Sequence, residues 1–154
     1  MDATSSPQMP WLISKLQEDF PNIQFEESPT TAWNPVTRTV YYSKKCPPHL
    51  VLHELGHGLL NHQSYSRDIE LLGYERDAWE EAKKIATNYT VELQQNDIEK
   101  HLDSYRDWLH SRSTCPACES SGLQTAKYRY TCLACKHIWR VNEARTCALR
   151  RYTT

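Results

Sequence analysis

The chain lacks a long apolar run. No stretch approaches the roughly 18 uncharged apolar residues of a membrane-spanning helix, and the first residues lack the basic segment and apolar core of a secretory signal. Internal repeats and low-complexity tracts are also missing. These absences predict a soluble, cytoplasmic protein with no membrane partner. The 154 residues, 39% of them hydrophobic, are enough for one ordinary domain with a small attached module.

The pattern of a disulfide framework is missing as well. Of six cysteines, four fall in two Cys-x-x-Cys pairs near the C-terminus, and Cys46 and Cys147 stand alone. In a chain without a signal segment, this distribution favours metal ligands over disulfides.

Charge is unevenly spread although the formal net charge is only -1. Residues 1–99 hold 8 basic against 15 acidic side chains, whereas residues 100–154 hold 10 against 4. The two parts of the chain are therefore expected to meet different partners, or each other. A basic segment of this kind fits nucleic acid but is also common in modules that are merely soluble.

The first part of the sequence predicts a helix and a small sheet. Apolar residues at helical spacing follow Pro10, and Pro21 stands just past the end of that pattern. Short β-rich segments follow around residues 23–25, 30–33 and 37–42, with the turn signal Asn34-Pro35 between the last two. We expect them to form an antiparallel sheet.

The rest of the first 112 residues predicts three helices. Apolar positions recur at helical spacing from the Pro47-Pro48 pair to about residue 61, and a looser segment covers residues 63–73. A charged helix is expected at residues 74–95, and Asn96 is a plausible N-cap for a further helix that leads to the cysteine module.

The first of these helices carries a His-Glu-x-x-His motif. His53 and His57 lie one turn apart on the same face, so both imidazoles can point at one zinc ion while Glu54 projects beside it. Zinc lowers the pKa of a bound water, and an adjacent carboxylate can take the proton of that water. Glu54 is therefore the predicted general base, and Gly56 would let another backbone approach the helix closely.

A catalytic zinc needs a third protein ligand, and the sequence leaves its identity open. His62 is one candidate, but a continuing helix would rotate it off the metal face. A carboxylate from the next helix is the other possibility, and Glu75 is preferred over Asp77, Glu80 and Glu81. For a donor to the substrate carbonyl oxygen there are four candidates, between which the sequence does not choose: Tyr65, Tyr74, His62 and Arg76.

Residues 53–62, with the sequence HELGHGLLNH, and the following Glu75-x-x-Ala78 segment resemble the ImmA/IrrE-like zinc metallopeptidases. The likeness covers roughly residues 20–90. It implies a compact gluzincin-like domain in which His53, His57 and Glu75 hold zinc and Glu54 is the base. It also implies protein substrates, regulatory proteins among them, and an edge at the strand of residues 37–42 for an extended peptide.

The four paired cysteines predict a second, structural zinc site. Cys115, Cys118, Cys132 and Cys135 form two knuckles that can fill a tetrahedral site, with a strand expected at residues 125–131 between them. Basic and aromatic side chains alternate through this module, which suits stacking on bases and pairing with phosphates, although the same rings could cover the zinc site or dock on the first domain. A His-Glu-x-x-His domain followed by a zinc ribbon is similar in layout to the SprT-like proteases, which act on DNA-associated proteins.

Together these features predict an α+β protein: a small zincin-like domain at residues 1–95, a connecting helix at 96–112, a four-cysteine zinc ribbon at 113–146 and a tail at 147–154. The predicted activity is zinc-dependent cleavage of a peptide bond in a protein, with two zinc ions per chain, one catalytic and one structural. The rival interpretation is a non-catalytic zinc-binding adaptor whose ribbon recruits nucleic acid or a protein.

Overall fold

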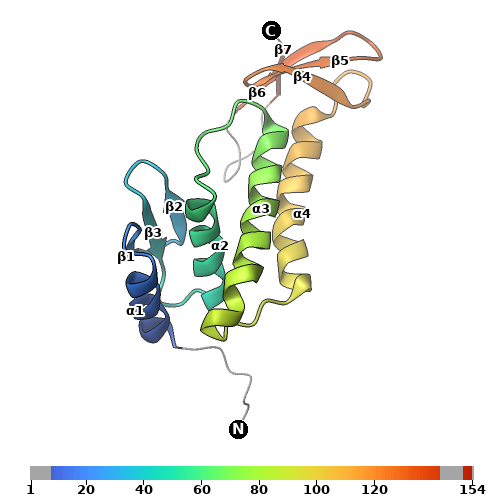
Figure 1. Ribbon diagram of the computed structural model, residues 1–154. Coiled ribbons are helices and arrows are strands. Elements are labelled where there is room, and N and C mark those ends of the chain that lie inside the picture. The colour runs from blue at the N-terminus through green and yellow to red at the C-terminus, as the bar shows by residue number, and fades with distance from the viewer. Residues whose placement is uncertain (1–7, 143–150, 154) are drawn as a thin grey trace. The chain divides into compact units, whose positions relative to one another are not determined.

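The computed structural model describes residues 8–142 and 151–153, and the chain divides into two compact units. The first unit holds residues 1–63 and 74–98, and the second holds residues 64–73 and 99–154. The described residues form an α+β structure with two small sheets (Figure 1). Its elements are α1 (Met9–Asp19), β1 (Gln24–Glu27), β2 (Ala32–Asn34), β3 (Thr39–Tyr42), α2 (Pro48–Leu59), α3 (Asp68–Ala86), the 3-10 turn η1 (Thr87–Tyr89), α4 (Gln95–Ser113), β4 (Gly122–Ala126), β5 (Arg129–Cys132), β6 (Ile138–Val141) and β7 (Arg151–Thr153).

The sheet of the first unit is mixed. Its strand order is β1-β3-β2, with β3 antiparallel to β2 and parallel to β1. The expectation of an antiparallel sheet therefore holds for β2 and β3 and is wrong for β1. The expected peptide-binding edge at residues 37–42 is wrong too, because β3 is the central strand and β1 and β2 are the edges. Asn34 accepts hydrogen bonds from the N–H groups of Val36 and Thr37, which explains the β2–β3 hairpin, whereas no local signal marks the pairing of β1.

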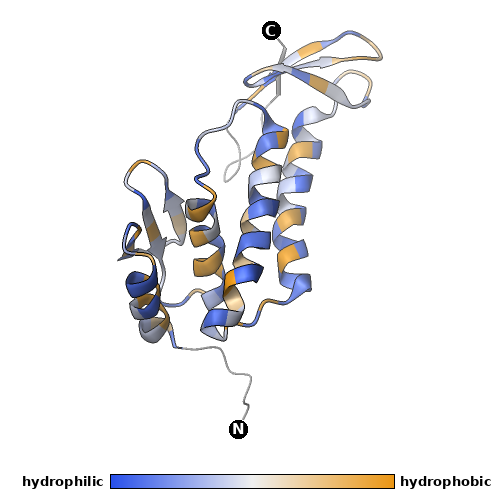
Figure 2. Ribbon diagram, in the orientation of Figure 1, coloured by the Kyte–Doolittle hydropathy of each residue, from blue (hydrophilic) through white to orange (hydrophobic). Residues whose placement is uncertain are grey.

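Apolar side chains fix the histidine helix against this sheet. α2 packs on β2 and β3, and Val51, Leu52 and Leu55 are completely buried together with Val40 of β3. The apolar character of α2 is visible in Figure 2. A Cβ on Gly58 would lie 2.8 Å from the Trp33 ring, so the absence of a side chain there lets β2 and α2 meet. The sheet thus serves as the platform that orients α2.

The helix boundaries differ from the expected ones where long-range contacts intervene. α3 begins at Asp68, six residues before the predicted start, because the Asp68 N–H donates to the Gln124 side chain at 2.7 Å. It ends at Ala86, well before residue 95, in the turn η1, and Thr90 follows in a left-handed conformation at φ 52°. The Tyr89 hydroxyl in that turn donates to Asp19 at 2.6 Å.

The second unit contains an antiparallel sheet of order β4-β5-β6-β7. The single strand predicted at residues 125–131 is instead a hairpin of β4 and β5, which turns at Lys127 and Tyr128, the latter at φ 65°. No Gly, Asn or Pro marks this turn. Of the predicted tail at 147–154, only Arg151–Thr153 are described, as strand β7; the remainder, including Cys147, lies outside the described residues.

Within the second unit, a buried ion pair connects α4 with the first turn of α3, and hydrogen bonds connect this pair to the sheet of β4 to β7. The Arg112 Nε atom lies 2.8 Å from the Asp68 carboxylate, and both residues are almost fully buried. The Tyr130 hydroxyl donates to the same carboxylate at 2.6 Å, and the Trp139 indole donates to the Arg112 carbonyl at 3.0 Å. Arg112 also donates to the Asn142 carbonyl. Since each charge is paired and hydrogen-bonded, its burial is tolerated.

None of the helices in the described part of the chain combines the length and the apolar character that crossing a bilayer demands.

Candidate functional site

Three side chains of the first unit converge on one point. Two come from α2, namely His53 and His57, and the third is Glu75 of α3. The Nε2 atoms of the histidines lie 3.3 Å apart, and the Glu75 Oε2 atom lies 2.7 Å from that of His53 and 3.2 Å from that of His57. All three residues are buried, with exposed fractions of 1%, 8% and 5%. The structure therefore brings together the three residues that the sequence favoured as ligands.

The spacing of these atoms matches the donor set of a metal site. In a tetrahedral zinc site with bonds of about 2.0–2.1 Å, ligand atoms lie about 3.3 Å from one another. Two of the three separations are close to that value, and the third, between His53 and Glu75, is the length of a direct hydrogen bond. Two imidazoles and one carboxylate are also the three protein ligands of one known class of catalytic zinc site. The residues present can therefore hold a metal ion.

A close helix crossing positions Glu75 opposite the histidines. A Cβ on Gly56 would stand 2.5 Å from the Ala78 carbonyl oxygen, so only glycine permits this approach of α2 and α3. Gly56 lies between the two histidines in the sequence, and Ala78 lies one helical turn after Glu75. The glycine that the sequence singled out thus lies where the two helices that carry the candidate ligands touch.

The ring of His53 is held by an aromatic residue that sequence reasoning did not assign to the site. Trp79 stacks on it with ring centres 4.2 Å apart and an interplanar angle of 27°. Trp79 is 1% exposed and follows Glu75 by four residues, so both side chains lie on the same face of α3. The spacing of four residues between Glu75 and Trp79 is the sequence feature that could have placed Trp79 at this site.

His62 lies beside the site rather than in it. Its Nδ1 atom is 2.9 Å from Nδ1 of His57, whereas Glu75 faces the other ring nitrogen of His57. The Tyr74 ring stacks on His62 with centres 4.3 Å apart. α2 ends at Leu59, and Asn61 takes a left-handed conformation that turns the chain back so that His62 N–H donates to the His57 carbonyl. Burial and the neighbouring His57 lower the pKa of His62, which favours the neutral ring.

The other carboxylates that the sequence considered as ligands lie in surface ion pairs. Asp77 pairs with Arg76, Glu80 with Lys83 and Glu81 with Lys84. The Arg76 side chain is about two-thirds exposed and pairs with Asp77 at the surface. Glu54 is half-buried on α2 and directly follows His53 in the sequence.

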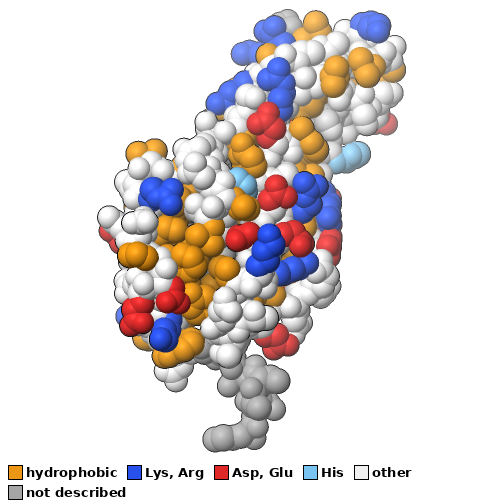
Figure 3. Space-filling view, viewed as in Figure 1, with side chains coloured by type: hydrophobic (Ala, Val, Ile, Leu, Met, Phe, Trp, Pro, Cys, Tyr) orange, Lys and Arg blue, Asp and Glu red, His pale blue; other side chains and the backbone are white. Residues whose placement is uncertain are grey.

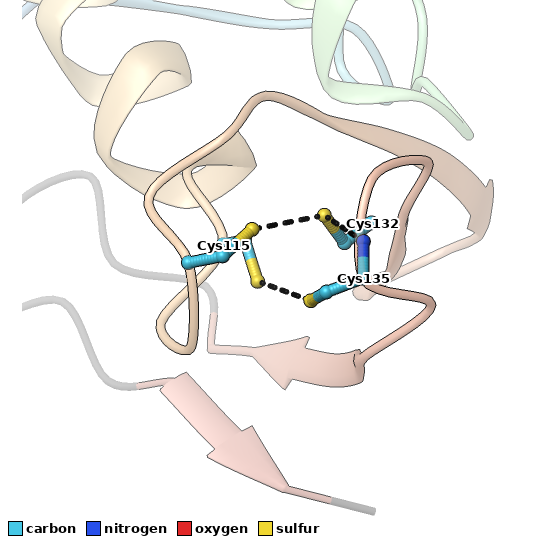
Figure 4. A group of neighbouring side chains, drawn as sticks. Cys115, Cys132 and Cys135 are labelled. Carbon is cyan, nitrogen blue, oxygen red and sulfur yellow. Dashed lines mark hydrogen bonds between the residues drawn. The ribbon is translucent and has the colours of Figure 1, made fainter.

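The four paired cysteines gather in the second unit. Their sulfur atoms all lie within 4.8 Å of one another, with Cys115 and Cys135 at 3.7 Å and Cys118 and Cys132 at 3.4 Å (Figure 4). Sulfur ligands about 2.3 Å from a tetrahedral zinc are separated by about 3.8 Å. None of these four cysteines is in a disulfide, and the same is true of Cys46. The cluster can hold a metal ion through four thiolates.

The two knuckles repeat one backbone geometry. The fourth residue after each leading cysteine, Glu119 or Lys136, is left-handed, and its N–H donates to the carbonyl of that cysteine at 2.9 or 3.0 Å. A backbone N–H inside each loop also points at the leading sulfur at 3.4 Å. Such donors favour thiolates. Side-chain and backbone hydrogen bonds from Ser120 lower the pKa of Cys118 to about 6, whereas desolvation and hydrogen bonds with the other three cysteines raise the pKa of Cys135.

Two aromatic rings of the second unit are buried in its core. Tyr130 and Trp139 are directly opposite on β5 and β6, stack at 5.6 Å and are buried with Cys115 and Cys132 in the core of the second unit. They are therefore not available to stack on bases. Basic side chains remain exposed, among them Lys127 and Arg129.

Comparisons of the chain with family models, with curated proteins and with solved structures find no match.

Proposed function

We propose that this chain is a zinc-dependent metallopeptidase of the His-Glu-x-x-His type with a structural zinc ribbon. The observation that carries the proposal is the convergence of the His53, His57 and Glu75 donor atoms within 3.3 Å of one another. The buried carboxylate is costly in an apolar site unless it is paired or binds a cation. The burial and geometry of this set thus support a role in holding a metal.

Zinc held by these residues would supply a Lewis acid that lowers the pKa of a bound water and polarises the scissile carbonyl. Glu54 acts as the general base: its carboxylate accepts the proton of the attacking water and passes it to the leaving amine. Trp79 and His62 keep the two imidazoles in place, and the Gly56–Ala78 contact keeps Glu75 in register with them.

The resemblance to ImmA/IrrE-like metallopeptidases suggests a regulatory protein as the substrate. The support for this is local: the histidine motif lies on a helix, and the glutamate of the Glu-x-x-Ala segment lies on the next helix and faces it. The mixed sheet beside α2 leaves β1 and β2 as edges on which an extended segment could pair.

The direct test is hydrolysis of a fluorogenic peptide library by zinc-loaded wild-type protein and by Glu54→Gln. We expect turnover by the wild type and a loss of several orders of magnitude in Glu54→Gln, with zinc content and circular dichroism unchanged. Glu80→Gln is the matched control, because Glu80 is an exposed glutamate paired with Lys83, and it should keep full activity. Equal turnover by wild type and Glu54→Gln would refute the mechanism.

The second candidate is a non-catalytic adaptor, and the observation that favours it is the excess of basic residues in the C-terminal part of the chain, which also holds the four-cysteine cluster. Residues 100–154 carry 10 basic against 4 acidic residues, and Lys127, Arg129 and Lys136 are exposed. Binding of DNA or RNA that weakens steeply with salt, together with no cleavage of the library by either protein, would establish the adaptor instead.

A further inference from the structure

The second unit contains a groove that the proposed peptidase site does not use. It has a volume of about 380 Å³ and is bounded by the first residues of α3, the end of α4 and the edge strand β4. Ile69, Leu109 and Leu123 line it with Arg67, Gln124 and Tyr130. We call it the ribbon groove.

The walls of the ribbon groove are apolar and open to water. Ile69 is 59% exposed and Leu123 is 56% exposed, although both are large aliphatic side chains. Both residues line the same cavity together with Leu109, so they give it an exposed apolar surface, a feature found at binding sites. Their high exposure also means that the groove is shallow, so it suits a side chain presented by a protein better than a ligand that must be enclosed.

The polar groups along the groove are already engaged within the unit. The Gln124 side chain accepts from the Asp68 N–H and donates to the Ala126 carbonyl. The Ser113 hydroxyl donates to the His110 carbonyl, and the Tyr130 hydroxyl donates to Asp68. An occupant therefore finds few hydrogen-bonding groups, which disfavours sugars and nucleobases. Tyr130, at 2% exposure, offers no ring for a base to stack on.

Arg67 gives the groove a positive charge. Its guanidinium donates to the carbonyls of Ser66 and Thr125, which are neutral groups, and no carboxylate among the described residues forms an ion pair with it. Arg129, on the neighbouring strand β5, is also exposed. A carboxylate placed at the rim would complete a charge-assisted hydrogen bond with Arg67.

We propose that the ribbon groove docks a protein segment in which an aliphatic side chain stands next to a carboxylate. The aliphatic side chain enters between Ile69 and Leu123, and the carboxylate pairs with Arg67. The Lys and Arg side chains that lie near apolar side chains over the ribbon in Figure 3 agree with an acidic, apolar partner. This site is separate from the His53, His57 and Glu75 centre in its residues and in its chemistry.

The proposal is tested by fluorescence anisotropy with the 154-residue chain that carries Glu54→Gln, so that the proposed general base is absent, and with short labelled peptides in a Gly/Ser background. The three peptides carry Leu-Glu, Leu-Lys or Ala-Glu at the centre. We expect the Leu-Glu peptide to bind about tenfold tighter than either of the others, the gain typical of burying one aliphatic side chain or forming one charged hydrogen bond.

Variants distinguish docking in the ribbon groove from nonspecific hydrophobic binding. Leu123→Asp should weaken the Leu-Glu peptide about tenfold, whereas Ile138→Asp, at an exposed aliphatic position on β6 outside the groove, should leave it unchanged. Arg67→Glu should reverse the preference toward the Leu-Lys peptide, which an indirect structural effect would not do. Equal binding of the three peptides, or displacement of the Leu-Glu peptide by oligothymidylate or decanoate, overturns the proposal. Each result is independent of whether the chain cleaves peptides.

Discussion

His62 contacts His57 through the ring nitrogen that does not face Glu75. The two Nδ1 atoms lie 2.9 Å apart, and Nε2 of His57 lies 3.2 Å from the Glu75 carboxylate. A proton on Nδ1 of His57, donated to His62, leaves the Nε2 lone pair available to a metal. Because burial and His57 lower the pKa of His62, the neutral ring that can accept this hydrogen bond is favoured.

His62→Ala should therefore weaken metal binding at the first unit about 10–100-fold, the range found for residues that hydrogen-bond to histidine ligands. The measurement is competition with a chromophoric chelator, with the ribbon metal as an internal reference. His62→Gln retains an acceptor and should recover part of the affinity. An affinity in His62→Ala equal to that of the wild type would show that the contact does not orient His57.

Replacing Glu75 should remove one metal ion of two. Elemental mass spectrometry of the zinc-loaded protein is expected to find two zinc ions per chain in the wild type and one in Glu75→Ala. Asp77→Ala, two residues away in a surface ion pair, should retain both and serves as the control. Two zinc ions in Glu75→Ala would mean that another residue completes the site.

Gly56→Ala should destabilise the first unit. The added Cβ would stand 2.5 Å from a backbone oxygen of Ala78, which cannot move without shifting the helix. The expected loss is about 1–3 kcal/mol of unfolding free energy, as for overpacked cores, measured by urea denaturation. Gly73→Ala is the matched control: a Cβ there meets nothing within 4 Å, and alanine in α3 should stabilise by up to about 1 kcal/mol. Equal effects of the two substitutions would exclude a steric cause.

Tyr130→Phe should destabilise the second unit by about 1–2 kcal/mol, because the Asp68 carboxylate loses a buried donor. Burial and Asp68 raise the pKa of Tyr130, so the folded state holds the phenol proton more tightly than the unfolded state. Its contribution is thus present below the ordinary tyrosine pKa of about 10 and is lost as the pH rises above it. Urea denaturation of both proteins from pH 8 to 11 measures this, and a difference that does not shrink above pH 10 would contradict the assignment.

The sequence was sufficient to identify groups of side chains that lie close together along the chain. The spacing of His53 and His57 requires only a helix, and the pairing of the cysteines within each knuckle requires only a tight loop, so both groups could be identified from sequence. Glu75 could be ranked but not selected, because Asp77, Glu80 and Glu81 belong to the same helix and the sequence does not show which face turns inward. The structure places Glu75 inside and the other three in surface ion pairs.

The features that the sequence did not predict depend on contacts between distant residues. The early start of α3 depends on Gln124, 56 residues away, and the parallel pairing of β1 with β3 has no turn signal. Trp79 can stack on His53 only because α2 and α3 cross. The buried hydroxyl of Tyr130 donates to Asp68, which also pairs with Arg112 of α4. Sequence alone determined the kinds of side chain in each candidate metal site and their local spacing. Tertiary structure decided which carboxylate joins them, because only packing sets the rotation of one helix against another.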